Sequence, residues 1–306
     1  MKKVGIEIPG TEQPESRVSV AISENLHGVL IVSEVRVGER RQSIFLPWLP
    51  PQAGSSSPRL KLELKAIWEQ PEPILDFTLL DSGSKLLVLG VEKLSLYDMA
   101  DGKWKLAGSI PLQLSRPLSR DPRGRLIAEQ TIFHVWLPGT SCTGSALPPL
   151  GASCIAGNEE WAGHRWVNDR NYLERVGVQG TFYSAAVLEN GARRILAGLD
   201  GRVRDQVNET VSGASGWGSD LAGPFTVCGS ASLVLATSAS ERDASDSVAA
   251  YEIAAGAETP SSEAVPLPGP VVALWPAGDR DQANVVVRNA RRGSYEASRL
   301  RLACAE

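Results

Sequence analysis

Short apolar segments separated by polar turns run along most of the chain. The clearest set lies at 74–112, where ILDFTLLD, KLLVLGV, KLSLYDM and KWKLAGSIPL follow one another with only short polar turns between them. The third segment alternates, with Leu94 and Leu96 on one side and Tyr97 and Met99 on the other. The second is apolar at nearly every position, as in a strand buried on both faces. Four short strands at this spacing predict an antiparallel meander.

The same order of segments recurs further along the chain. Residues 223–267 and 269–302 each repeat it, and 181–207 holds a weaker copy. The endings SIPL and AVPL correspond, as do LSLYD and VAAYE. The N-terminal part at 16–50 adds three alternating strands and 59–68 adds another. Helical periodicity is scarce, so the pattern predicts an all-β protein.

Four-stranded repeats of about 40 to 55 residues are typical of the blades of a β-propeller. At about 42 residues per blade, the 306 residues of the chain predict seven four-stranded blades. We therefore expect one β-propeller domain over 1–306, with 1–15 as an extended N-terminal segment. A pair of β-sandwich domains is the alternative that the strand pattern leaves open.

The repeat units resemble those of WD-repeat and quinoprotein-type propellers. LAGLDGRVRD is similar to the Asp-Gly turn between inner strands of quinoprotein-like repeats, although no Gly-His and Trp-Asp pair recurs. The stretches at 119–126, 182–188, 216–223 and 293–304 resemble uncharacterised exported propeller-like proteins of environmental bacteria. The resemblance covers most of the chain from about residue 74 onward. It implies the fold and export, and it implies no activity.

The cysteines bear on the cellular compartment. No CxxC motif occurs and the histidines are scattered, which argues against a zinc site. A disulfide between Cys142 and Cys154, across a Gly/Ser/Pro-rich loop, would stabilise the fold by roughly 2–3 kcal/mol. A second bridge, Cys228 to Cys304, would tie the C-terminal strand to a neighbour in a closed ring. Disulfides favour a periplasmic or extracellular protein, and four buried thiols in a cytosolic protein are the alternative.

Charge and hydropathy narrow the range of partners. The net charge of −4 argues against nucleic acid, whose phosphates need dense Lys and Arg. No run of about 18 apolar residues is present, so we expect no membrane span. The start MKKVGIEIPG is basic but lacks the apolar middle of a signal peptide. We expect an exported protein whose export signal is not part of this sequence.

Motifs for catalysis or metal binding are weak. The chain has no G-x-S-x-G elbow and no phosphate-binding loop. DRDQAN at 279–284 and ERDASDSVAA at 241–250 lack the glycine of a calcium loop and are interpreted as polar hairpin loops. We therefore expect no metal, no cofactor and no catalytic residue.

Loop acids keep one enzymatic alternative open. Glu159, Glu160 and Asp169 could act as paired carboxylates in a glycan hydrolase if they approach one another at a channel mouth. In RDPRGR at 120–125, we interpret Asp121 as bracing Arg123 or Arg125 within a charged turn.

One cluster stands out as a candidate binding site. The segment EEWAGHRWVNDRNY at 159–172 places aromatic residues beside Arg and Asp, which suits sugar stacking or a protein hot spot. The alternative is a long loop between blades whose two Trp pack on the ring. The candidate binding residues are Trp161, His164, Arg165, Trp166, Asp169 and Arg170.

Together these features predict a monomeric, non-catalytic binding or scaffold module of the bacterial envelope or exterior. It would engage an unknown protein or glycan through loops on one propeller face. The alternative is a propeller hydrolase, glycan-active or a lactonase, with carboxylates at the channel mouth. Converging carboxylates or a cation would favour the enzyme, whereas a channel plugged by Val, Ala and Leu would favour the binder.

Overall fold

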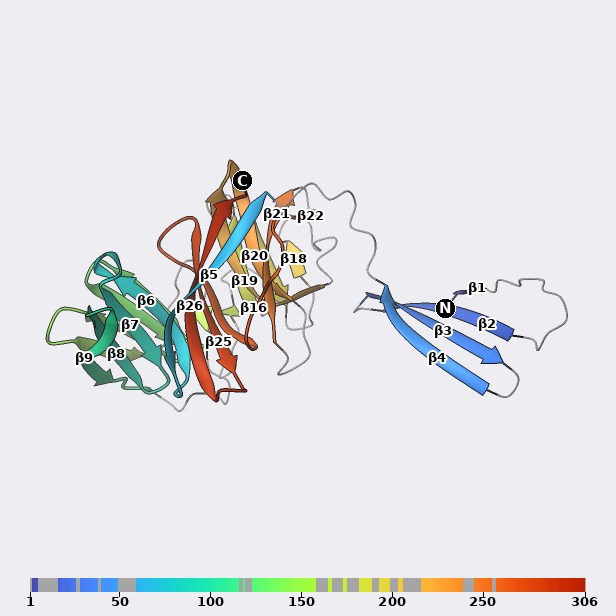
Figure 1. The fold of residues 1–306 in the computed structure, drawn as a ribbon. Helices are drawn as coiled ribbons and strands as arrows, with labels where there is room; N and C mark the ends of the chain where they lie inside the picture. The colour runs from blue at the N-terminus through green and yellow to red at the C-terminus, as the bar shows by residue number, and fades with distance from the viewer. Residues whose placement is uncertain are drawn as a thin grey trace. The chain divides into compact units, whose positions relative to one another are not determined.

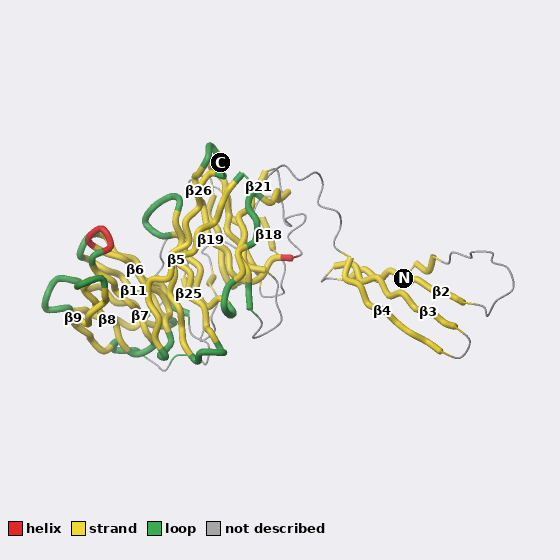
Figure 2. The backbone as a smooth tube through the Cα atoms, viewed as in Figure 1, coloured by secondary structure: helices red, strands yellow, loops and turns green. Residues whose placement is uncertain are grey.

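The computed structural model divides the chain into two compact units, Met1–Ser57 and Pro58–Glu306, and each unit is described by itself. The single domain predicted over 1–306 thus corresponds to two units. Strands make up almost all of the regular structure (Figure 2). The described residues are 2–4, 16–25, 28–37, 40–48, 59–115, 118, 123–157, 165–166, 173–174, 182–188, 193–198, 203–205, 216–238, 245–254 and 257–305.

The N-terminal unit is an antiparallel meander (Figure 1). The three alternating strands predicted at 16–50 are present, and residues 2–4 of the expected extended segment add a fourth strand at the edge. The sequence of β2, SRVSVAISEN, alternates apolar and polar residues over much of its length, which is typical of a strand. The strands, in sheet order, are β1 (Lys2–Val4), β2 (Ser16–Asn25), β3 (Gly28–Val37) and β4 (Arg40–Trp48).

The second unit contains five sheets, which we call blades 1 to 5. Blade 1 contains β6 (Ile74–Leu80), β7 (Lys85–Gly90), β8 (Lys93–Ala100) and β9 (Lys103–Pro111), and the 3₁₀ turn η1 (Asp81–Gly83) joins β6 to β7. Blade 2 contains β10 (Arg125–Glu129), β11 (Ile132–Leu137), β12 (Thr140–Ser145) and β13 (Gly151–Ala156). Blade 3 contains β14 (Arg165–Trp166), β15 (Leu173–Glu174), β16 (Phe182–Leu188), β17 (Arg193–Gly198) and β18 (Val203–Asp205).

Blade 4 contains β19 (Trp217–Val227), β20 (Ser230–Ser238), β21 (Ser247–Ala254), β22 (Ala257–Pro260) and the short β23 (Val265–Pro266). Blade 5 contains β24 (Val271–Pro276), β25 (Gln282–Asn289), β26 (Ser294–Cys304) and β5 (Leu60–Gln70). Because β5 comes from the start of the unit and β26 from its end, this pairing closes the ring (Figure 1).

The β-propeller prediction is confirmed, but seven blades was wrong: the structure has five. The prediction of seven blades assumed that all 306 residues belong to blades of about 42 residues. In the structure the first 57 residues form a unit of their own, and the five blades share 58–306 at about 50 residues each. Longer blades and a separate N-terminal sheet account for the difference.

The core lies between blades. The strands β6 and β10, β16 and β19, β19 and β24, and β24 and β6 contact one another, so these strands form the inner wall of the ring. The prediction that 85–91 is buried on both faces is confirmed for β7, where Leu86 packs in one interblade cluster and Leu87 in another. Each blade therefore buries both faces only because it has neighbours on both sides.

The closing strand is attached to its surroundings at several points. The Leu60 N–H donates to the Ser261 carbonyl in blade 4 at 2.9 Å. On the other side, the Trp104 Nε1–H of blade 1 donates to the Ile67 carbonyl at 3.0 Å. The rings of Trp68 and Tyr97 pack with their centroids 4.4 Å apart. Blade 5 is thus joined to both neighbours through its N-terminal strand.

Within the described part of the chain, no helix is long and apolar enough to cross a membrane.

Candidate functional site

The inner wall of the ring carries a buried carboxylate, Asp76 on β6, which has no exposed surface. Its Oδ2 accepts from Arg125 Nη1 at 2.6 Å and from the Leu126 N–H at 2.8 Å. Its Oδ1 accepts from the Phe77 N–H at 2.8 Å. Burial raises the pKa of the Asp76 carboxyl, and the Arg125 guanidinium and the two backbone N–H groups oppose that rise.

Arg125, at the start of β10, connects three blades. Besides pairing with Asp76 of blade 1, its Nη2 donates to the Pro276 carbonyl of blade 5 at 3.2 Å. Its guanidinium lies over the Trp275 ring, 5.0 Å from the centroid, and so gains a cation–π contact. All the partners of this arginine are structural groups of the inner wall.

A second ion pair spans two blades that are not neighbours. Arg123, just before β10 in blade 2, binds both carboxylate oxygens of Asp220 on β19 in blade 4, with 2.8 Å between Nη2 and Oδ2. The Asp220 side chain is only 4% exposed. Blade 3 is joined to the same place, because Ser184 Oγ donates to the Ser219 carbonyl at 2.6 Å and accepts from the Leu221 N–H at 2.8 Å.

These contacts decide what the two inner-wall carboxylates can do. A general base or nucleophile needs access to substrate or water, but Asp76 is fully buried and Asp220 nearly so, and each is held by an arginine. Among the described residues of the inner wall, Asp76 and Asp220 are therefore neutralised by arginine and join the inner strands. The loop acids Glu159, Glu160 and Asp169, which the sequence led us to consider, lie outside the described residues.

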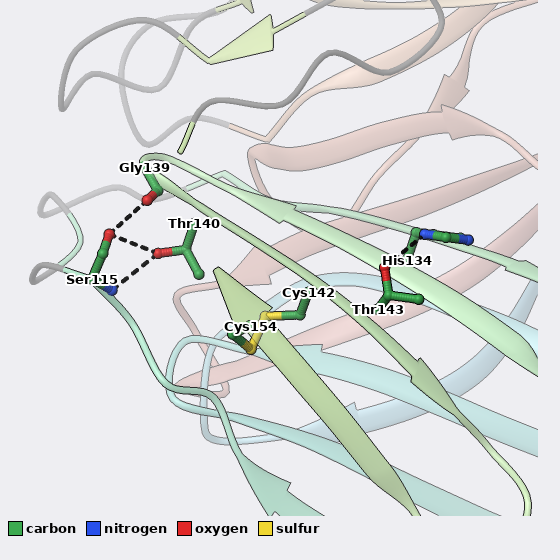
Figure 3. Close-up of a disulfide and its surroundings, with 7 residues drawn as sticks. All are labelled: Ser115, His134, Gly139, Thr140, Cys142, Thr143 and Cys154. Atoms are coloured by element: carbon green, nitrogen blue, oxygen red, sulfur yellow. Dashed lines mark hydrogen bonds between the residues drawn. A yellow bond between two sulfur atoms is a disulfide. The ribbon is translucent and has the colours of Figure 1, made fainter. Parts of the chain in front are cut away.

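Both predicted disulfides are present. Cys142 and Cys154 lie opposite each other on β12 and β13, with their Cα atoms 4.0 Å apart (Figure 3). Cys228, in the turn between β19 and β20 of blade 4, is bonded to Cys304 at the end of β26 in blade 5. The first bridge lies within one blade, and the second links the C-terminal strand to a neighbouring blade.

The crossing from blade 1 to blade 2 is anchored beside the first bridge. Ser115 Oγ donates to the Gly139 carbonyl at 2.6 Å, and the Ser115 N–H donates to Thr140 Oγ1 at 3.1 Å (Figure 3). An open pocket of about 860 Å³ lies along this crossing. Its lining combines two charged side chains with apolar ones and consists of Glu92, Lys93, Ser109, Pro111, Leu112, Leu114 and Ser115.

The predicted binding cluster is not tested by the structure. Trp161, His164, Asp169 and Arg170 lie outside the described residues, as do the loop acids Glu159 and Glu160. Arg165–Trp166 forms β14, of which only the backbone is described. These residues therefore remain a prediction.

The charged turn has partners that we did not expect. Asp121 lies outside the described residues, so its predicted contact with Arg123 or Arg125 is not tested, and these two arginines pair with Asp220 and Asp76. In the proposed hairpin loop at 279–284, Asp281 lies 3.4 Å from Arg301 Nε. Among the described residues, no group of three or more His, Cys, Asp or Glu is arranged to hold a metal ion.

The inner-wall ion pairs were missed because long-range pairing leaves little local signal. The usable sign was a single acid inside an otherwise apolar strand, as for Asp76 in ILDFTLL. A buried acid of this kind needs a partner, and RDPRGR holds two arginines close together. The repeats along the sequence gave no sign that Asp76 and the arginines of RDPRGR would lie side by side.

Comparisons with known proteins give only distant likenesses. No protein-family model and no curated protein sequence matches the chain. Among solved structures, it is similar to a chain of the mitotic checkpoint complex, with 12% identity, a TM-score of 0.41 and 98% of each chain covered. It is similar to the Myceliophteria thermophila Cps50 (Swd1) β-propeller domain, with 12% identity, a TM-score of 0.41, and 95% and 97% covered.

A third similar structure is a putative 6-phosphogluconolactonase from Bacteroides uniformis, with 11% identity, a TM-score of 0.46 and 85% of each chain covered. At these identities and TM-scores the likenesses say nothing about activity or ligand. The propeller assignment rests on the sheet order and ring closure described above.

Proposed function

We propose that this chain is an exported, non-catalytic binding module that engages a protein or a glycan through loops on one propeller face. The main support is the inner wall, where Asp76 and Asp220 are buried and paired with arginine rather than accessible to a substrate. Two disulfides support export, because such bonds persist in oxidising compartments. A rigid ring that displays variable loops is suited to binding.

Affinity capture tests the proposal. The purified chain, immobilised with its disulfides intact, is incubated with envelope extract, and a Trp161→Ala, Trp166→Ala double variant serves as the comparison. We expect a partner that the wild type retains, and we expect the double variant to lose it if the cluster at 159–172 forms the contact. Equal recovery by both proteins would exclude the cluster, and absence of any specific partner would contradict the binding role.

A direct assay addresses the hydrolase alternative. The chain is incubated with a panel of lactones and aryl glycosides, and an Asp220→Asn variant is assayed beside it. Turnover by the wild type that Asp220→Asn abolishes, while the thermal midpoint is retained, would assign catalysis to the inner wall and overturn the proposal.

A further inference from the structure

The outer strands of most blades are protected against pairing with another chain. In blade 1, β9 carries Lys103 and Lys105, ends at Pro111 and pairs with β8 through an irregular register. In blade 4, β22 has only four residues and ends at Pro260. Charge, proline, irregularity and short length all discourage a further strand from adding to an edge.

The outer strand of blade 5 is protected in the same way. The first half of β5 reads LKLELK, with charges at alternate positions, and its register with β26 shifts between Ala297 and Ser298. By contrast, β13 of blade 2 reads GASCIA. It has no charge and no proline, and its pairing with β12 runs without a shift from Gly151 to Ala156.

The register of β13 shows which backbone groups face outward. The Gly157 N–H donates to the Gly139 carbonyl at 3.0 Å, in continuation of the β12–β13 register. In an antiparallel pair, bonded positions alternate with non-bonded ones, so Ser153 and Ile155 also bond to β12. The 4.0 Å between the Cα atoms of the Cys142–Cys154 pair is the short spacing of a non-bonded position. The N–H and C=O groups of the alternate residues therefore point away from β12, and these residues are Ala152, Cys154 and Ala156.

This outward edge is open and held in place. Every residue of β13 except Cys154 is exposed, and the Ile155 side chain is 55% exposed. Among the described residues, no strand pairs with the outer side of β13. The disulfide fixes β13 to β12 at its middle. A strand that is already ordered loses little entropy when a second strand adds to it.

We propose that an extended, uncharged segment of a partner protein adds to blade 2 as a strand along β13; this inference rests on the binding role proposed above. The outward N–H and C=O groups of Ala152, Cys154 and Ala156 provide its main-chain hydrogen bonds, and the exposed Ile155 receives an apolar side chain. The absence of charge on β13 selects a segment without charges at the paired positions. Six paired residues bury far less than the roughly 1,200 Å² of a stable protein pair, which fits a transiently added segment better than a permanent dimer of rings.

The test uses a defined probe, the fluorescein-labelled peptide acetyl-Lys-Thr-Val-Thr-Val-Thr-Val-Thr-Lys-amide, with the disulfide-intact protein. We expect a change in anisotropy with a dissociation constant of about 100 μM or tighter. The same peptide, methylated on the nitrogen of each central residue, loses its donors and should not bind. In hydrogen exchange, binding should slow the amides of Ala152, Cys154 and Ala156 by about tenfold or more. The amides of Ser153 and Ile155, already bonded to β12, should change little.

Two variants and one control locate the binding on β13. Ile155→Lys places a charge on the edge, and Ala152→Pro removes one outward N–H without breaking the ladder to β12. Each should weaken peptide binding by about tenfold. Leu106→Lys, at a 62% exposed position on the protected β9, should leave it unchanged. Retained thermal midpoints show that the variants are folded.

Several results would overturn the inference. These are no binding by the wild type, equal binding by Ile155→Lys, or binding that leaves the three outward amides exchanging fast. If those amides already exchange slowly in the free protein, β13 is covered before any partner binds, and the proposal is contradicted. Light scattering then shows what covers it: a dimer would mean a second copy, and a monomer would mean another segment of the same chain. If Ile155→Lys still captures the envelope partner, the β13 inference fails while the binding function stands.

Discussion

The inner wall and the outer rim of the propeller use opposite kinds of residue for opposite purposes. At the inner wall, Asp76 and Asp220 are charged, yet they are buried and paired with arginine. At the rim, β13 has no charged side chain but is exposed along nearly its whole length. These two carboxylates therefore join the blades of the ring, whereas β13 is the strand to which we propose that a partner adds.

The largest expected effect comes from breaking the inner wall. Asp76→Ala leaves the Arg125 guanidinium nearly buried without its carboxylate, so we expect a loss of about 3–5 kcal/mol in the free energy of unfolding. The matched control is Asp98→Ala, whose partner Lys85 is at the same 2.6 Å but in a more exposed pair, and which should cost less than about 1 kcal/mol. Denaturant unfolding of both variants measures the difference. Equal losses would show that burial does not set the strength of these pairs.

The two disulfides sharpen the comparison further. Cys228→Ser with Cys304→Ser opens a loop of 76 residues and should cost about 4.5 kcal/mol, whereas Cys142→Ser with Cys154→Ser opens one of 12 and should cost about 3 kcal/mol. The first pair also joins blade 4 to β26, the strand whose pairing with β5 closes the ring. Thermal unfolding under oxidising conditions ranks the two. The reverse order would mean that the β5–β26 ladder alone keeps the ring closed.

A smaller effect is expected at the outer part of blade 4. Burial raises the pKa of Glu258 on β22 to about 7, and its Oε2 is buried with no hydrogen-bond partner among the described residues. Because the folded pKa lies above the unfolded one, the native state loses stability as the pH rises from about 4.5 through 7. Glu258→Gln removes that loss.

We therefore expect the thermal midpoint of Glu258→Gln to equal that of the wild type at pH 4. At pH 8 the midpoint of the variant should exceed that of the wild type by about 2 °C. This corresponds to about 1 kcal/mol once the partial exposure of the side chain is allowed for. A calorimetric series across this pH range measures the difference. A constant offset at all pH values would show that the carboxyl does not titrate in this range.

The smallest effect on stability is expected where we infer the largest effect on binding. Ile155→Lys changes a side chain that is 55% exposed, so the free energy of unfolding should shift by no more than about 0.5 kcal/mol. Denaturant unfolding checks this value. A loss of several kcal/mol in the free energy of unfolding would show that Ile155 packs in the core. It would then no longer be true that β13 lies at an exposed rim while the stabilising contacts lie at the inner wall.

The fold class could be predicted from the sequence because blade repeats leave local marks. The apolar runs of β7 and β25 are second strands of their blades, and the Tyr-acid pairs that end LSLYD and VAAYE lie on the third strands of blades 1 and 4. Both disulfides followed from the same reasoning, since Cys154 ends a small loop and Cys304 lies in the last strand. Blade number could not be predicted, because the lengths of the connections vary and the first 57 residues form a separate unit.

The ion pairs of the inner wall could not be predicted from the sequence pattern, for a different reason. Arg123 and Asp220 are 97 residues apart, and Arg125 and Asp76 are 49 apart, so only closure of the ring brings them together. The open edge of β13 was equally hidden, because GASCIA looks like part of a loop until the register with β12 is known. Local patterns identify strands, whereas the partner of each strand and each charge depends on the completed ring.

The strand β5 is the first strand of the propeller unit to be translated, yet its partner β26 is the last strand of that unit in chain order. During synthesis, the backbone N–H and C=O groups of β5 that bond to β26 therefore have no partner strand until the other strands of the unit have been made. The ring cannot close before β26 has been synthesised, and throughout that interval the alternating charges of LKLELK discourage β5 from pairing with other nascent chains.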